Sequence, residues 1–477
     1  ALTSDIFPGM NSGIDASDVI PSETITISTN FCLKQTTGLW AAPGHPFTVT
    51  IPPEYIGDIS LSVGIWNGDV RKFSSWERIP GILIFDYPLD ASTTTIANAF
   101  GGPIYINIPC DYFEDNGSFL EFDVTISEAV PMIYFKRGET TEEDWNNQLA
   151  TRFAPWAEIE ADFTIYTIPR ENIAVESFAT IQSVADNWSI IASNYADFRD
   201  KIPDLFKERG IVDVHVAYGY MFASYPINGP LGEVSNLLHD PNAWGWLHEM
   251  GHRFERGNSY GPEAGAMWNM FNGNVEVFTN VFSCIGILAM DGDNSRCVDN
   301  NGAPATIGSS GWNNLGPFEK LDFYMMLRDG FGWEAFTNTL TRGRTFRFPD
   351  NDNDKRTRLW LLLSERVGRN IFPLFDMYEI DVAVDGLYNQ IILSDLATSF
   401  IRMNNPPIDI SESSSHSTIT SGSLLCGETG PSQLFSSSTS CSFSSGGTIE
   451  YNLPVSETGE LSISFWMNYN VLPGSSI

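Results

Sequence analysis

The chain has 477 residues, 42% of them hydrophobic, and this length suggests about two to four domains with sizeable buried cores. Its 26 basic and 59 acidic side chains give a net charge of −33, which argues against nucleic acid and anionic membrane as partners. No apolar run reaches the length that spans a bilayer, and the amino terminus lacks a signal-peptide pattern, so a signal peptide is either absent or already removed.

Residues 1–130 carry the alternating apolar pattern of short β-strands, punctuated by Pro and Gly. The segments with this alternation include 47–51, 59–63, 104–108 and 120–124. Short strands separated by regular turns predict a β-sandwich. Three tryptophans of this region could stack on sugars, although large aromatic side chains more often pack in a core: Trp40, Trp66 and Trp76.

Residues 131–405 mix strand and helix patterns. A strand pattern over 163–168 ends at a proline, the stretch 173–200 has helical spacing, and 212–216 predicts a further strand. The segment 224–227 follows, just upstream of a predicted helix that carries two histidines. Mixed strands that lead into a metal-binding helix are typical of zincin-type zinc peptidases, in which an edge strand pairs with the substrate backbone.

Residues 248–252 spell HEMGH, an HExxH pattern, and this is the strongest functional signal in the chain. Asp240 is a good N-cap, Pro241 suits a first helical turn and Gly257 suits a stop, so we expect a helix between them. Both imidazoles then share one face and can bind one metal ion, while Glu249 can reach a metal-bound water without being a ligand. The alternatives are a chance match and an inert helix with a solvated polar face.

A catalytic zinc ion needs three protein ligands and an open position for water. His248 and His252 supply two of them. Glu255 lies only three residues after His252 on the same helix, which is a poor position for the third ligand, and Glu263 lies in a loop. Glu276 lies 24 residues after His252, among apolar neighbours that indicate burial, and a buried carboxylate needs a counter-charge such as zinc. We therefore predict Glu276 as the third ligand, with Glu263 as the runner-up.

Glu249 suits the role of general base, because it can take a proton from the attacking water and return it to the leaving amine. Asn280, one turn after Glu276, either hydrogen-bonds a ligand imidazole or is a polar residue of the helix face. A Tyr or His usually stabilises the oxyanion, and we predict Tyr324 for this role. The alternatives for the oxyanion are Tyr260, Tyr225 and His239.

Further helices are predicted at 274–290, 317–330, 332–342 and 354–367. The acidic segment 350–354 has the spacing of a calcium loop but lacks the downstream glutamate, so we interpret it as an N-capping turn.

The six cysteines form one distant and two local pairs: Cys32 and Cys110, Cys284 and Cys297, Cys426 and Cys441. Each local pair brackets a polar loop, which suits a disulfide. Two N-x-S/T sequons are present, at Asn116 and Asn187. Together these features favour an extracellular, secreted or cell-surface protein.

The C-terminal part changes in composition. Residues 406–447 are rich in serine and predict a linker. Strand patterns return at 448–453 and 461–466, in a terminal segment, 448–477, that is too short for a sandwich. This segment is either a small appendage or the first part of a truncated domain.

With these residues in place, the chain resembles the peptidase M60-like (enhancin/mucin-degrading) zinc metallopeptidase family. The family pattern is HExxH, a variable gap and a Glu on a following helix, which matches 246–252 and 274–280. Further matching segments are 37–44, 154–158, 224–227 and 320–324, within a resemblance that spans about 35–400. Val275 stands where the family often has Gly, and Arg253-Phe254 stand where Asn-rich residues often follow; these departures concern subsite preference and leave the metal site intact.

The resemblance implies a multidomain fold: an N-terminal β-sandwich, then a mixed α+β metallopeptidase domain of the gluzincin type. It implies Zn²⁺ as cofactor and O-glycosylated, mucin-like proteins as substrates. Family members often carry carbohydrate-binding modules, and the Phe465-Trp466 tail resembles the opening of a lectin-like β domain. We expect a monomer. Two other functions stay open: a non-catalytic glycan-binding adhesin with a vestigial metal site, and a general zinc protease with no glycan requirement.

Overall fold

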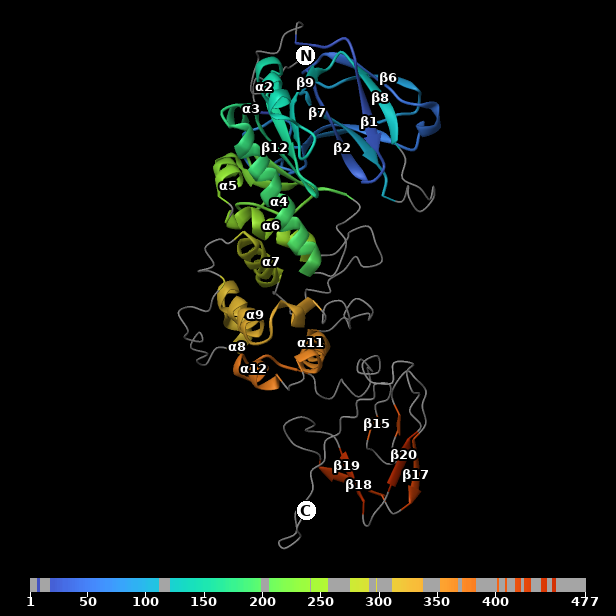
Figure 1. Cartoon of the computed structure of the whole chain (residues 1–477), viewed down its shortest axis with the longest axis vertical. Helices are drawn as coiled ribbons and strands as arrows, with labels where there is room; N and C mark the ends of the chain where they lie inside the picture. Colours follow the sequence, from blue (N-terminus) through green and yellow to red (C-terminus); the bar gives the residue numbers. More distant parts are fainter. Residues whose placement is uncertain are drawn as a thin grey trace. The chain divides into compact units, whose positions relative to one another are not determined.

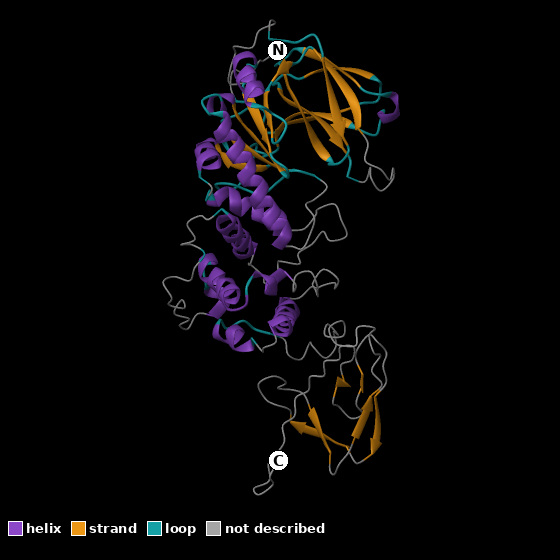
Figure 2. Ribbon diagram, in the orientation of Figure 1, coloured by secondary structure: helices purple, strands orange, loops and turns teal. Residues whose placement is uncertain are grey.

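The fold is described from a computed structural model, in which strands dominate up to about residue 230 and helices the part from there to residue 377 (Figures 1 and 2). The described residues are 7–8, 18–110, 121–198, 206–240, 242–255, 275–290, 297, 311–337, 352–367, 371–382 and the strand residues 401–402, 408–409, 417–421, 424–429, 439–443 and 448–451. The chain divides into two compact units, and the first contains residues 1–269, 273–306 and 315–341.

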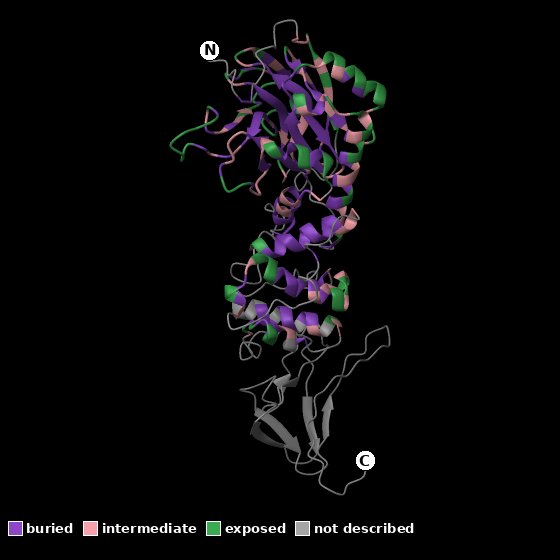
Figure 3. Cartoon of the chain, turned by 90° about the vertical axis from the view of Figure 1, so that its left-hand side faces the viewer, coloured by how far each residue is buried: buried purple, intermediate pink, exposed green. Residues whose placement is uncertain are grey.

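Two antiparallel sheets form the predicted N-terminal β-sandwich. One sheet has the order β1 (Glu23–Ser28), β8 (Glu121–Ser127), β3 (Pro46–Thr50) and β6 (Thr93–Ala97). The other has the order β5 (Leu83–Pro88), β4 (Ser60–Trp66), β7 (Gly102–Ile108), β2 (Leu33–Ala41) and β9 (Val130–Pro131). Inward-facing side chains of both sheets, such as Phe47 and Val124 from one and Leu61 and Ile106 from the other, share one core. These inward-facing residues are buried, and buried residues are purple in Figure 3.

The structure shows where the cysteine pair and the three tryptophans of this domain lie. Cys32 and Cys110, the distant pair of the sequence, form a disulfide, which joins the residue before β2 to the segment after β7. Trp40 and Trp66 have no exposed surface and pack in the interior, whereas 44% of Trp76 is exposed. Of the three tryptophans, only Trp76 therefore presents a surface to a ligand.

A third sheet, which has five strands, follows the sandwich in the same compact unit. Its order is β10 (Ile133–Lys136), β11 (Trp156–Glu160), β12 (Thr164–Pro169), β13 (Glu208–Asp213) and β14 (Ile227–Pro230). The pair β11–β12 is antiparallel and the other three pairs are parallel. We call it the peptidase sheet below, because it lies in the predicted metallopeptidase domain, and β14 is one of its two edge strands.

The position of β13 corrects a sequence prediction. A strand is expected at 212–216, but β13 runs from Glu208 to Asp213. Its two charged N-terminal residues are buried because each has a partner: Glu208 accepts from Arg253 at 2.9 Å, and Arg209 pairs with Glu158 at 3.0 Å. Hydrophobic alternation misses such a strand, because paired charges take positions that the pattern reserves for apolar residues.

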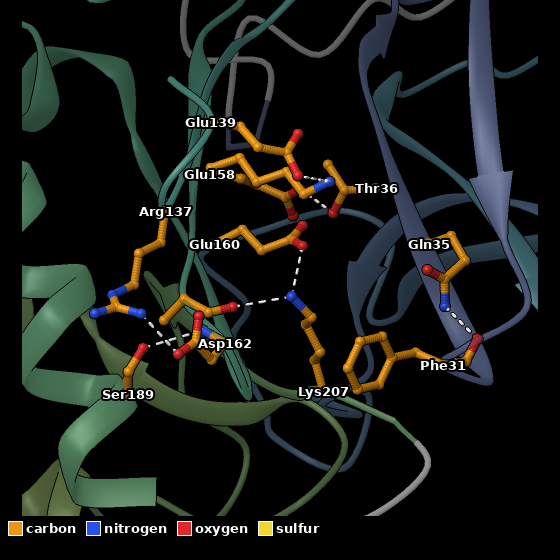
Figure 4. Close-up of polar contacts among 12 residues, drawn as sticks. Phe31, Gln35, Thr36, Arg137, Glu139, Glu158, Glu160, Asp162, Ser189 and Lys207 are labelled. Carbon is orange, nitrogen blue, oxygen red and sulfur yellow. Dashed lines mark hydrogen bonds and ion pairs between the residues drawn. The ribbon is translucent and has the colours of Figure 1, made fainter. Parts of the chain in front are cut away.

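The sandwich and the peptidase sheet share a buried polar network around Glu158 and Arg209, neither of which has exposed surface. Tyr105 of β7 donates its hydroxyl hydrogen bond to Glu158 at 2.6 Å, and Arg209 donates to the Thr36 hydroxyl of β2 at 2.7 Å. Nearby, Lys207 points at the Glu160 carboxylate at 2.7 Å (Figure 4). Because a buried charge is costly without such partners, this network fixes the two sheets against each other.

Helices pack beside the peptidase sheet, and four of them frame the candidate site: α4 (Phe178–Phe198), α6 (Trp244–Glu255), α7 (Val275–Ala289) and α9 (Pro317–Phe331). Trp246 anchors α6 on the sheet, where a Cβ atom at Gly210 or Gly229 would lie 3.1 or 2.9 Å from its ring. The bounds of α7 and α9 match the predicted helices, and residues 333–337 within the predicted helix 332–342 are helical. The shorter helices of this part are α2 (Glu142–Thr151), α3 (Arg170–Ile173), α5 (Val234–His239) and the 3-10 turn η2 (Leu231–Glu233), while the 3-10 turn η1 (Pro53–Tyr55) lies in the sandwich.

The start of the HExxH helix differs from the prediction. Asp240 is the C-terminal cap residue of α5 rather than the N-cap of α6. Its carbonyl accepts from the Ala243 amide at 3.0 Å, so it forms the turn between the two helices, and α6 begins four residues later at Trp244. In a sequence, an Asp in a turn is easily mistaken for the N-cap of a helix, because Asp is common at both positions. Pro241 and Gly257 lie outside the described residues.

The second unit contains α8 (Gly311–Asn314), α11 (Asp352–Val367), α12 (Phe372–Met377) and short antiparallel strand pairs. The pairs are β15 (Ile401–Arg402) with β16 (Ile408–Asp409), β17 (Ser417–Ser421) with β20 (Thr448–Tyr451), and β18 (Leu424–Thr429) with β19 (Thr439–Phe443). Strands therefore occur within the segment predicted as a linker. Cys426 and Cys441 are cross-strand neighbours, as a disulfide there requires.

Nothing in the described C-terminal residues supports a lectin-like domain, and 461–466 lie outside them. Asp352 to Asp354, from the acidic segment, form the first residues of α11, while residues 350–351 are also outside the description. None of the described helices combines the length and the apolar character that membrane crossing needs.

Candidate metal centre

Three predicted ligands come together where α6 meets α7 (Figure 1). Glu276 Oε2 lies 3.1 Å from His248 Nε2 and 3.6 Å from His252 Nε2. One ligand atom from each residue lies within 4.8 Å of the other two, and among the described residues this is the one group of at least three such side chains. The four-residue spacing on α6 places both imidazoles on one face, and α7 brings the carboxylate to them.

The donor set fits a zinc ion. Two imidazole nitrogens and one carboxylate oxygen are the usual protein ligands of catalytic zinc. In a tetrahedral site with bonds of about 2.0–2.1 Å, neighbouring ligand atoms lie about 3.3 Å apart. The two nitrogen–oxygen distances to Glu276, 3.1 and 3.6 Å, lie on either side of that value. Three protein ligands converge among the described residues, and a tetrahedral ion held by these three would have a fourth position for water.

Each imidazole is oriented through its other ring nitrogen. Asn280 Oδ1 lies 2.7 Å from His248 Nδ1, and the Asn280 amide in turn donates to the Glu276 carbonyl at 2.8 Å. Glu255 Oε2 lies 3.2 Å from His252 Nδ1. A hydrogen bond at Nδ1 fixes the ring and leaves Nε2 for a metal.

The role of Glu255 was missed by sequence reasoning, which considered it only as a ligand. It lies three residues after His252 on the same helix, and 2% of its side chain is exposed. The signal that could have found it is the spacing itself, because residues three apart on a helix are neighbours. An acidic residue that is badly placed as a ligand is well placed to hydrogen-bond the back of the ring.

The electrostatics favour positive charge between these residues. Burial by itself lowers the pKa of His252, but hydrogen bonds with the Glu255 and Glu276 carboxylates outweigh it and raise the pKa to about 9. Hydrogen bonds with His248 and His252 lower the pKa of Glu276 well below its usual value. A site that stabilises a proton on an imidazole in this way also suits a bound cation.

Glu276 differs in one respect from the prediction. Burial was expected from its apolar neighbours, but 62% of its side chain is exposed. Its place in the first turn of α7 explains this, since the following residues Val277 and Phe278 are the ones that α7 buries. The counter-charge argument was therefore wrong for Glu276, and its position beside the imidazoles is the reason to regard it as a ligand.

Glu249, the predicted base, lies beside the ligands on α6 and is buried. Burial raises the pKa of its carboxyl, the neighbouring imidazoles lower it, and a hydrogen bond from the Ala223 backbone N–H also lowers it. The Glu249 carboxylate therefore faces the 222–226 segment. A carboxylate fixed in this way can accept and return a proton.

The two ligand helices approach closely around Gly251. A Cβ atom at this position would lie 2.6 Å from Thr279 Oγ1 and 2.8 Å from the Thr279 carbonyl oxygen of α7. The Thr279 hydroxyl donates to the His248 carbonyl. Glycine within the HExxH motif thus lets α7 lie close enough for Glu276 to reach the imidazoles.

Tyr324, predicted to stabilise the oxyanion, is fully buried on α9. Its ring packs edge-on against Phe278 at 5.3 Å. Phe278 is two residues after Glu276, and side chains two apart leave a helix about 200° from each other. This contact therefore lies on a different face of α7 from Glu276, and the role of Tyr324 stays a prediction without support from this geometry. Of the alternatives, Tyr225 packs its ring on Phe206, His239 contacts Glu176, and Tyr260, like Glu263, lies outside the described residues.

The edge of the peptidase sheet is also relevant, because a substrate backbone was expected to pair there. β14 is the edge strand, yet Phe222 already pairs with Asn228 through two backbone hydrogen bonds of 3.0 Å. The outermost backbone beside the site is therefore the 222–226 segment. A substrate strand would meet this segment rather than Asn228.

Comparisons with known proteins identify the family and agree with the two-domain organisation of the chain. Residues 128–379 match the family model described as peptidase M60, enhancin and enhancin-like, and residues 22–127 match the N-terminal domain of M60-like peptidases. TRPM8 channel-associated factor 3 of Rattus norvegicus is 29% identical over 394 residues, which cover 76% of this chain and 41% of that protein. The chain thus spans about two fifths of the length of the curated relatives that it matches.

Two solved structures share the fold. A functionally unknown conserved protein from Bacillus anthracis has a TM-score of 0.61 at 16% identity, over 77% of this chain and 78% of that one. IMPa from Pseudomonas aeruginosa, solved in complex with an O-glycopeptide, has a TM-score of 0.55 at 18% identity, over 76% of this chain and 50% of that one. The family match covers more than half of the chain, and this chain therefore belongs to the peptidase M60, enhancin and enhancin-like family.

Proposed function

We propose that the chain is a secreted or cell-surface zinc endopeptidase that hydrolyses peptide bonds in O-glycosylated, mucin-like glycoproteins. The observation that carries the proposal is the convergence of His248 Nε2 and His252 Nε2 on Glu276 Oε2, with the Glu249 carboxylate beside them. Convergence of this kind is what a catalytic zinc site requires, and a structural helix has no need of it.

The residues of the chain have distinct tasks in this reaction. His248, His252 and Glu276 would hold the zinc ion, which when bound polarises a peptide carbonyl and makes a water molecule more acidic. Asn280 and Glu255 keep the two imidazoles oriented. Glu249 accepts the proton of the attacking water and then passes it to the leaving amine.

The substrate class rests on the family and on the relatives. IMPa, which shares the fold, was solved in complex with an O-glycopeptide, and another metallopeptidase of this fold was solved in complex with Tn antigen. Two disulfides within the described residues, Cys32–Cys110 and Cys284–Cys297, support an extracellular location.

The direct test compares the wild-type chain with Glu249→Gln on an O-glycosylated protein, with and without a chelator. We expect the substitution to lower the rate of cleavage by about 10²–10⁴-fold while zinc stays bound, because the carboxylate is not a ligand. Glu54→Gln, at an exposed position of η1, is the matched control and should cleave at the wild-type rate. Undiminished turnover in Glu249→Gln would contradict the proposed mechanism.

A second comparison tests the glycan requirement. The same substrate is digested before and after enzymatic removal of its O-glycans, and the product ends are sequenced. We expect cleavage to depend on the glycan. Equal rates would leave a general zinc protease as the function.

The curated relatives are named as factors associated with the TRPM8 channel, and the second candidate is therefore a protein that associates with another protein. A vestigial metal site would be expected in that case, as in a glycan-binding adhesin. Elemental analysis separates the two, because only the peptidase needs about one zinc ion per chain.

A further inference from the structure

The segment 222–228 joins the catalytic base to the edge of the peptidase sheet. Just before this segment, Met221 packs on α6, because its Sδ atom would lie 2.6 Å from a Cβ atom at Gly245, which is four residues before Glu249 on the same face of the helix. This contact places the backbone of Ala223 beside the Glu249 carboxyl, whose pKa it lowers through a hydrogen bond. At the other end, Asn228 belongs to β14 and has no exposed surface. Between them, the Asn228 amide donates to the Pro226 carbonyl at 2.7 Å. The position of Ala223, and with it the orientation of Glu249, thus depends on what holds this segment.

A residue of the N-terminal β-sandwich holds it. Asn67 directly follows β4, and its side-chain amide donates to Ser224 Oγ at 2.9 Å and to the Tyr225 carbonyl at 3.0 Å. Its carbonyl oxygen accepts from the Asn228 amide at 3.1 Å. One side chain therefore makes three hydrogen bonds to three residues of the segment, within a stretch of five residues.

Asn67 is itself anchored to the peptidase sheet on both sides. The indole of the preceding residue, Trp66, donates to the Val212 carbonyl of β13 at 2.9 Å. After Asn67, the Gly68 carbonyl accepts from Arg78, whose guanidinium forms a fully buried ion pair with Asp213 at 2.9 Å. A buried, hydrogen-bonded ion pair of this kind has little freedom to move. The side chain of Asn67 is thus held at a fixed position relative to β13.

We propose that Asn67 of the β-sandwich is a positioning residue for the reaction, which holds the 222–228 segment so that the Ala223 N–H orients the Glu249 carboxylate. The inference rests on the function proposed above, because it assigns a role in that reaction. It also makes the sandwich a part of the catalytic apparatus rather than a separate module. Asn67 touches neither the substrate nor the metal ligands in this role and acts through the backbone of the segment.

The test uses Asn67→Ala and a matched control, Asn107→Ala, in the complete chain. Asn107 also donates two hydrogen bonds to side chains, to Ser60 at 3.1 Å and Ser62 at 2.7 Å, but these partners lie within the sandwich. We expect Asn67→Ala to lower kcat about tenfold or more, since small displacements of a catalytic group have large effects on rate. KM should change by less than about threefold and the zinc content should stay the same, since the ligands are untouched.

A second variant guards against a folding defect. Asn67→Asp keeps the shape and the ability to accept from Asn228, but it places a carboxylate oxygen against the Tyr225 carbonyl. We expect it to lower kcat as well. Hydrogen exchange provides an independent reading: amides of residues 221–229 should exchange about tenfold faster in both variants than in the wild-type chain and in Asn107→Ala.

The outcomes separate the two proposals. An active wild-type chain whose kcat is unchanged by Asn67→Ala, or is lowered equally by Asn107→Ala, overturns the role of Asn67 and leaves the proposed function intact. A wild-type chain that cleaves no glycoprotein overturns the proposed function, and the catalytic role of Asn67 is rejected with it. Exchange at 221–229 that is the same in all variants shows that Asn67 does not hold the segment and refutes the inference.

Discussion

Gly251→Ala gives the sharpest prediction about the metal centre, because helix propensity and the close approach of α7 predict opposite effects of this substitution. Alanine favours a helix over glycine by about 1 kcal/mol, so by propensity alone Gly251→Ala would stabilise α6. The structure predicts the opposite for zinc binding. The added Cβ atom would lie 2.8 Å from the Thr279 carbonyl oxygen and 3.0 Å from Phe282 Cβ.

The size of the effect follows from these distances. Non-bonded heavy atoms are in ordinary contact at about 3.5 Å, so α6 and α7 must separate by roughly 0.5–0.7 Å to accept the methyl group. Glu276 lies on α7, one turn before Thr279, and moves with it. Metal–ligand distances tolerate only about 0.2 Å, so we expect zinc to bind about 10–100-fold more weakly.

The assay is a competition titration of zinc against a coloured chelator. Gly330→Ala on α9 is the control, because a Cβ atom there meets no heavy atom within 4 Å and only the helix propensity changes. Thermal unfolding in the presence of a chelator reports the stability of both variants without the metal. If Gly251→Ala binds zinc within about twofold of the wild-type affinity, the close approach of the two helices does not set the metal site.

Three further predictions concern other parts of the chain. Asn280→Ala should weaken zinc binding about 10–100-fold in the same titration, because it removes the partner of His248 Nδ1, and an unchanged affinity would contradict that role. Cys32→Ser should lower the free energy of unfolding in urea by about 2–5 kcal/mol, since it opens the bridge to Cys110, and an unchanged midpoint would argue against the bridge. Burial lowers the pKa of Lys34 to about 8, so between pH 8 and 10 the unfolded chain binds more protons than the folded chain and the free energy of unfolding should rise with pH. The urea midpoint of Lys34→Met should lack this rise, and an equal pH dependence of the midpoint in both chains would refute the prediction.

The sequence predicts much of this site because its pattern is local. Four-residue spacing on a helix determines that His248 and His252 share a face, whatever the rest of the chain does. Glu276 was chosen partly on an expected burial that the structure contradicts, and the structure nevertheless places Glu276 and Asn280 beside the imidazoles because the following helix packs against the first. The β-sandwich could also be predicted from the sequence, because a strand that buries every second residue has an alternating apolar pattern.

The remaining features depend on contacts between distant segments. No local pattern marks Glu208 and Arg209 as strand residues, because their partners, Arg253 and Glu158, lie 45 and 51 positions away. The contribution of Asn67 could not be predicted for the same reason, since its partner Ser224 is 157 positions away. Hydrophobic periodicity indicates which apolar residues are buried, but it does not indicate which polar residues form hydrogen bonds or ion pairs with each other.

The polar network around Glu158 and Arg209 bears on where this chain can be divided. The two family matches meet between residues 127 and 128, which suggests a cut that would release the peptidase half. Such a fragment would lose Tyr105 and Thr36, the partners that the sandwich supplies to the buried ion pair. It would also open the interior face of β11 and β13 to water. The sequence families end at that boundary, but the folding unit continues across it, and an expression fragment should begin before β1.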